Sequence, residues 1–138
     1  MADLEPRAAE HTEVGEHASV LATVSNAMVR LYKDLFGRGP TKARTYFAGP
    51  DVLVCILGDT FTPAERNLVA MGEQQRLRDA RVFFQHAAET QFRESVEEIV
   101  GRKVVGFVSG VDVSEDIAAE IFVLEPDPGR RPVAISRP

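Results

Sequence analysis

The sequence predicts an α+β domain, in which a mainly antiparallel four-stranded sheet packs against helices. One observation is an apolar stripe of helical period that precedes the first strand-like run. The others are two pairs of short strand-like runs, each pair joined by turn residues, with further helical stripes between the pairs. The expected order is α-β-β-α-α-β-β, and consecutive hairpins favour helices on at least one face of the sheet. The chain has 138 residues, which suits a single domain.

The first predicted helix runs from about residue 13 to residue 36. Its apolar side chains recur every three or four residues, at Val20, Val24, Ala27, Met28, Leu31 and Leu35. The helix should end at "GRGP", because Gly37 and Gly39 readily adopt a positive φ and Pro40 cannot continue a helix.

Two strand-like runs follow, 43–47 and 52–57, with the turn Gly49-Pro50-Asp51 between them. The second run, "VLVCIL", is apolar at every position, which is typical of a strand covered on both faces. Its Cys55 is interpreted as a buried, inert thiol, since one cysteine makes neither an internal disulfide nor a metal knuckle.

The middle of the chain predicts two helices. Thr62 and Glu65 have the spacing of a capping box, with Pro63 at the first helical position. Gly72 should interrupt this helix, and a long third helix should end at Gly101. Its stripe comprises Leu77, Phe84, Phe92, Val96 and Ile99.

The last two strands are predicted in "KVVGFVSGVDV" and "IAAEIFVLE", joined by Ser114-Glu115-Asp116. Charged and small residues at 1–12 and four prolines at 126–138 predict flexible tails around a single domain at 13–125.

The composition of the chain argues against several classes of protein. Apolar residues make up 44% and charged residues 27%, which is ordinary for a globular protein. The net charge of -5 argues against nonspecific nucleic-acid binding. We expect a cytoplasmic protein, because no apolar run approaches a membrane span and the acidic N-terminal stretch lacks the features of a secretory signal.

The stretch "GRGPTKARTY" supplies the first candidate site, with the cations Arg38, Lys42 and Arg44 and the hydroxyl of Thr41. These groups suit a phosphate, a carboxylate, a bicarbonate or an acidic partner surface. The alternative is helix termination with solvated charges, because cations complement the partial negative charge of a helix C-terminus.

A second basic cluster lies in "QRLRDARVFF". Arg76, Arg78, Arg81 and Phe83 are candidates for a protein interface, and adjacent phenylalanines hint at a homodimer or another homo-oligomer. The alternative is a solvated helix face.

Other sites find little support. His11, His17 and His86 lack the i, i+4 spacing of a helical metal pair, so no metal site is expected. We find no dinucleotide fingerprint, nucleophile elbow or paired-carboxylate motif, so we predict no cofactor and favour a protein that is not an enzyme.

The segments "VRLYKDLFGRGPTKARTYFAGPDVLVCILGDTFTPAE", "RLRDARVFFQ" and "VEEIVGRKVVGFVSGVDVSEDIAAEIFVLE" together resemble the MpsC family of small bacterial proteins, from about Ser19 to Glu125. The resemblance implies a soluble accessory or regulatory component of a sodium-translocating, membrane-potential-generating system linked to uptake of inorganic carbon. Its partner would be a membrane transporter complex, bound peripherally. The resemblance brings no catalytic residues, but its "GPTK" run strengthens the region Gly39 to Lys42 as a candidate site.

The prediction is therefore a small accessory or regulatory binding module. Two other readings stay open: a small enzyme that holds an anionic metabolite with the same cations, and a purely structural oligomeric subunit whose corner residues only cap a helix.

Overall fold

Four strands form one antiparallel sheet in the order β1-β2-β4-β3. The structure is a computed structural model that describes residues 8–127, with side chains from residue 18 onward. Its elements are α1 (Ala8–Phe36), β1 (Lys42–Phe47), β2 (Val52–Gly58), α2 (Pro63–Ala70), α3 (Gln74–Ala87), α4 (Glu89–Val100), β3 (Val104–Asp112) and β4 (Ile117–Leu124). The predicted α+β class and the two predicted hairpins are confirmed.

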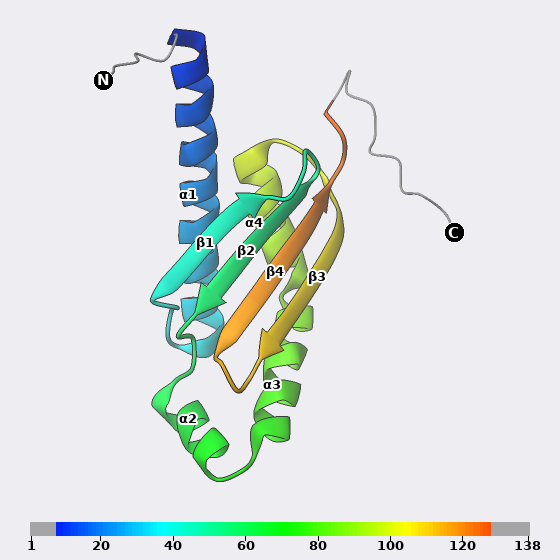
Figure 1. The fold of residues 1–138 in the computed structure, drawn as a ribbon. Helices are drawn as coiled ribbons and strands as arrows, with labels where there is room; N and C mark the ends of the chain where they lie inside the picture. The colour runs from blue at the N-terminus through cyan, green and yellow to red at the C-terminus, as the bar shows by residue number, and fades with distance from the viewer. Residues whose placement is uncertain (1–7, 128–138) are drawn as a thin grey trace, which may run out of the picture.

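The helices cover one face of the sheet. Figure 1 views the sheet from its other face, with α1, α3 and α4 behind the strands and α2 below them. The main core lies between these two layers and includes Met28, Leu53, Phe92 and Phe122, all fully buried. Since alternate strand residues point to opposite faces, each strand gives half of its side chains to this core.

The second face of the sheet is not covered by any described element, and we call it the open face (Figure 1). The expectation that the all-apolar second strand is covered on both faces is therefore wrong within the described residues. Leu53, Cys55 and Leu57 point into the core and are buried, whereas Ile56 on the opposite side is 37% exposed. The apolar outward residues of this strand need another explanation.

Local signals place most helix ends correctly. Gly37 ends α1 with φ 81°, and its N–H donates to the Lys33 carbonyl at 2.8 Å. Thr62 and Glu65 form both hydrogen bonds of the predicted capping box at the start of α2. Gly101 ends α4 in the left-handed conformation, with φ 70°. Gly39 differs from the expectation: it has no positive φ, and a Cβ there would lie 3.2 Å from the Val29 carbonyl oxygen.

Two boundaries differ from the prediction. The expected long third helix is divided at Ala88 into α3 and α4, although neither Gly nor Pro occupies the break. The first helix begins at Ala8, so residues 8–12 of the predicted tail belong to it. Residues 1–7 and 128–138 of the predicted tails lie outside the described residues.

Candidate functional site

The first candidate site forms where α1 turns into β1. The sharp turn at Gly37 and the close approach of Gly39 to α1 bring the chain back along the helix, and Pro40 is buried there. The chain then enters β1 at Lys42. This path places the four predicted site residues on two different sides of the turn.

Arg38 and Thr41 point toward Asp59, just after β2. The Arg38 guanidinium donates to the carbonyl of Asp59 and, at 3.0 Å, to its carboxylate. The Thr41 hydroxyl donates to the same carboxylate at 2.7 Å, and Arg66 pairs with its other oxygen. Hydrogen bonds from Thr41 and Arg38 hold the pKa of Asp59 below its usual value. These contacts fix the end of β2, where Asp59 has φ 57°.

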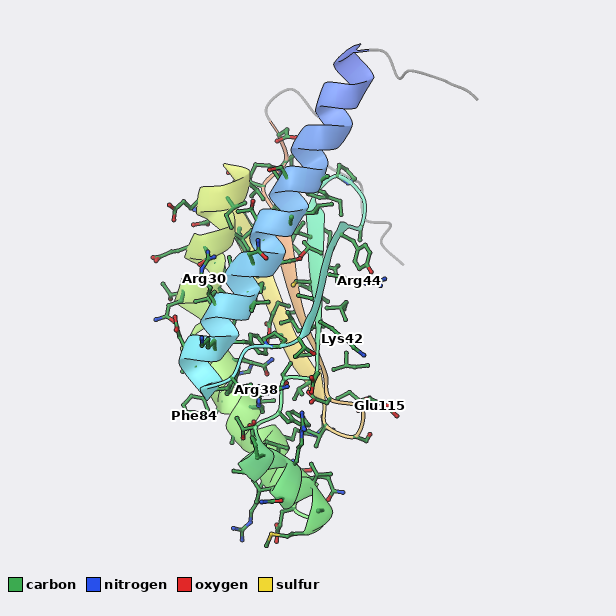
Figure 2. All side chains as sticks on the ribbon, turned by 90° about the vertical axis from the view of Figure 1, so that its left-hand side faces the viewer. Arg30, Arg38, Lys42, Arg44, Phe84 and Glu115 are labelled. Atoms are coloured by element: carbon green, nitrogen blue, oxygen red, sulfur yellow. The ribbon has the colours of Figure 1, made fainter. Side chains whose placement is uncertain are left out.

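Lys42 and Arg44 lie on the open face instead. Alternate residues of β1 share a face, and these two pair in register with Gly58 and Ile56 of β2. Both side chains are exposed, and neither forms an ion pair within the described part of the chain. Figure 2 shows both on the side of the sheet away from the helices, with Arg38 on the other side of the corner. The structure thus brings together two of the four predicted residues as accessible cations.

A shallow depression of about 350 Å³ lies beside these cations, at the lower end of the open face. Lys42 and Arg44 line one part of it, while Asp59, Glu115 and Asp116 contribute carboxylates. Asp116 is already engaged, since its carboxylate accepts from the backbone N–H groups of residues 60 and 61. The depression therefore carries both signs of charge.

Apolar side chains occupy most of the remaining open face. Five large ones are between 37% and 60% exposed: Tyr46, Ile56, Val108, Ile117 and Val123. They come from all four strands, and the apolar side chains of Val54 and Ile121 lie between them on the same face, so together they form one continuous surface. A contiguous exposed apolar surface bordered by charge is typical of a protein interaction site.

The second predicted cluster is dispersed. Arg81 is buried, with its guanidinium on the Glu65 carboxylate and over the ring of Phe36. Arg78 donates to the Val111 carbonyl, and Arg76 makes an exposed ion pair with Glu73. Phe83 is 68% exposed and packs edge-on against Phe84. Of these four candidates, Phe83 presents the most accessible apolar surface.

The core contains a polar group that the sequence analysis missed. The Glu120 carboxylate is fully buried and accepts from the Tyr32 hydroxyl at 2.5 Å and from the Gln85 amide at 3.1 Å. Burial raises the pKa of Glu120 to about 7, against the lowering effect of Ser109, Tyr32 and Gln85 beside it. Its position is readable in β4, because Glu120 shares the inward face with Ala118 and Phe122.

Cys55 is expected to stay unreactive in the native protein. Its side chain is fully buried, and burial raises the pKa of the thiol to about 11, so little thiolate forms at neutral pH. We expect Ellman's reagent to leave the native thiol unmodified and to titrate it completely in denaturant. Rapid modification of the folded protein at pH 8 would contradict the buried position.

Two other features, a metal-binding cluster and a membrane-spanning helix, are absent from the described residues. They contain no group of three or more His, Cys, Asp or Glu side chains arranged to hold a metal ion. None of the described helices combines the length and apolar character needed to cross a membrane. The arrangement with the clearest chemical use is the open face, where apolar side chains adjoin two accessible cations.

Comparisons with known proteins give a family and one relative. The family model described as "Na+-translocating membrane potential-generating system (MpsC)" matches residues 16–126. The uncharacterized protein YrhF of Bacillus subtilis (strain 168) is 30% identical over 98 residues, which cover 70% of this chain and 80% of that protein. No solved structure matches the chain significantly.

Proposed function

This chain belongs to the MpsC family, and from that premise we propose that it is an accessory binding module of a sodium-translocating, membrane-potential-generating system. It binds an acidic protein surface through the open face of its sheet. The supporting observation is the pair of accessible cations, Lys42 and Arg44, beside a continuous apolar surface.

The contrast with other arginines supports the choice of these two cations. Arg38, Arg81 and Arg102 each lie within 3.0 Å of a carboxylate of their own chain. Lys42 and Arg44 have no such partner within the described residues, so an incoming carboxylate meets charges that are not already neutralised.

The depression favours a protein surface over a small anion. A phosphate or an anionic metabolite close to Lys42 would also lie near the exposed carboxylate of Glu115, which repels it. A protein surface can place its acidic side chains on the cations and its apolar side chains on the strands. This geometry supports a binding module more than an enzyme acting on an anionic metabolite.

A complementation experiment tests the proposal. In the bacterium that encodes this protein, we expect deletion of the gene to lower the part of the membrane potential that depends on external Na⁺. The unmodified chain should restore it, whereas the Lys42→Glu/Arg44→Glu variant should not, because reversed charges repel an acidic partner. A potential-sensitive dye, read in Na⁺ medium and in K⁺ medium, measures the difference.

The matched control is Arg30→Glu/Lys103→Glu, which makes the same change in net charge at exposed positions. Figure 2 shows Arg30 on the helix side of the molecule, far from Lys42. The control should restore the potential fully. The proposal fails if deletion leaves the Na⁺-dependent potential unchanged, or if the Lys42→Glu/Arg44→Glu variant restores it as well as the control.

A further inference from the structure

We propose that the acidic protein surface on the open face belongs to a second copy of this chain, and that the two sheets pack face to face around a two-fold axis. This inference rests on the proposed function, because it names the partner of the same surface. The open face then makes a self-complementary contact, in which each copy supplies both the cations Lys42 and Arg44 and the carboxylate of Asp112.

The first argument is the distribution of charge across the sheet. Lys42 pairs in register with Gly58, Gly58 with Ile117, and Ile117 with Asp112, so one row runs from a cation on β1 to a carboxylate on β3. The Asp112 carboxylate is exposed, and the Glu115 N–H and Ser114 hydroxyl hold its pKa below the usual value. The two outer strands therefore carry opposite charges at the same end of the sheet.

The order of the strands determines which axis joins these charges. A two-fold axis parallel to the strands, between β2 and β4, places β1 over β3 of the second copy and β2 over its β4. Residues of the same row then meet, so Lys42 lies over Asp112 of the second copy. Aligned sheets cross at about 30° and lie about 10 Å apart, which long side chains such as these can span.

The second argument is the match of side-chain size in the next row. This row contains Arg44, Ile56, Ala119 and Gly110. The axis sets Ile56 over Ala119 and Arg44 over Gly110, so each large side chain meets a small one. The space above Gly110 is open, because a Cβ built there has no atom within 4 Å. Arg44 can thus extend across it toward Asp112 of the second copy.

The third row is apolar in every strand. It contains Tyr46, Val54, Ile121 and Val108, and the same axis sets Tyr46 over Val108 and Val54 over Ile121. Tyr46 is 47% exposed and Val108 is 60% exposed, so both have much apolar surface to bury. The charged row at one end and the apolar row beside it fit one arrangement of two copies.

Sedimentation equilibrium of the purified chain tests the dimer. One chain has a mass of 15.2 kDa, so the expected species is about 30 kDa (twice the chain), with dissociation on dilution. Ile121→Lys, at the centre of the contact, and Val108→Lys, at an exposed edge position, should each give a folded monomer. Circular dichroism confirms folding, and the exposed position of Val108 keeps the test valid if Ile121→Lys does not fold.

A charge swap tests the axis. Lys42→Asp and Asp112→Lys should each raise the dissociation constant of the dimer by roughly tenfold or more, and the double swap should restore much of the affinity. Arg30→Asp, on the helix side, should leave it unchanged. Three results would each overturn the inference. They are a parent chain that is monomeric at all concentrations, a dimer that persists in both lysine variants, and a double swap that does not restore the affinity.

The two proposals fail separately. A monomeric parent whose Lys42→Glu/Arg44→Glu variant still loses complementation would overturn the second copy and leave another acidic protein as the partner. In the opposite case, the dimer behaves as expected while deletion of the gene leaves the Na⁺-dependent membrane potential unchanged. That pair of results would overturn the proposed function alone.

Discussion

Replacing Arg81 with methionine is expected to lower the free energy of unfolding by about 3–5 kcal/mol, the usual effect of breaking a buried ion pair. The Arg81 side chain is 2% exposed and that of Glu65 is 17% exposed. Two guanidinium nitrogens donate to the Glu65 carboxylate, at 2.7 and 2.5 Å, and one also donates to the Thr60 carbonyl at 3.0 Å. Methionine keeps much of the volume but leaves these acceptors without their donor.

The same ion pair links three parts of the fold. Glu65 caps the first turn of α2, Arg81 belongs to α3, and the Arg81 guanidinium lies 3.7 Å from the centre of the Phe36 ring at the end of α1. Burial alone would raise the pKa of Glu65, but hydrogen bonds from Arg81 and Thr62 bring it below the usual value. Loss of Arg81 should therefore loosen α2 as well as α3.

Urea denaturation followed by circular dichroism measures this effect, with Arg76→Met as the matched control. Arg76 pairs with Glu73 on the surface, where the two side chains are 79% and 42% exposed. The control should change the free energy of unfolding by less than about 1 kcal/mol. Similar decreases in the free energy of unfolding for both variants would show that the buried Arg81 ion pair stabilises the fold no more than the exposed Arg76 pair does.

The stability of the protein is expected to fall by about 3 kcal/mol between pH 4.5 and pH 7 because of Glu120, at 1.36 kcal/mol for each unit of pKa shift. Its pKa rises from 4.5 to about 7 on folding, so in this window the native state keeps a proton that the unfolded state releases. The native carboxyl therefore favours folding fully below pH 4.5 and loses that contribution as the pH rises toward 7.

The groups around Glu120 explain the size of the shift. Tyr32 of α1, Gln85 of α3, Ser109 of β3 and Cys55 of β2 face the carboxyl, and none of them supplies a positive charge. One of its oxygens, Oε1, has no hydrogen-bond partner within the described residues. An ionised carboxylate is poorly compensated in such a place.

Comparison with Glu120→Gln isolates this contribution. The glutamine can still accept from Tyr32 and Gln85 but does not titrate. We expect the variant to be the more stable protein at pH 8 and to lose its advantage by pH 5, in urea titrations at each pH. A constant difference between the two proteins across this range would contradict the raised pKa.

The sequence predicts local features of this fold well because neighbouring residues determine them. Gly37 ends α1, and Thr62 and Glu65 start α2 as expected. The division at Ala88 has no such local signal, because neither Gly nor Pro occupies it, and the Ala88 side chain is buried in the main core. The alternation of side chains along a strand also accounts for the shared face of Lys42 and Arg44.

Contacts between distant parts of the chain cannot be predicted from neighbouring residues. Arg38 and Thr41 are near Lys42 in sequence, yet Asp59 engages them through the fold. Arg81 belongs to a run of charges typical of a solvated helix, but its partner lies 16 residues earlier. The apolar run in β2 is a third example, because the sequence shows that both faces are apolar but does not show what covers the outer one.

The central claim is that this protein binds through the face of its sheet that the helices leave open. The Na⁺-dependent membrane potential of cells that carry only the Lys42→Glu/Arg44→Glu chain tests this claim most directly. We expect these cells to match the deletion strain, while cells with the Arg30→Glu/Lys103→Glu chain match the parent. Equal, full recovery with both variants would contradict the claim.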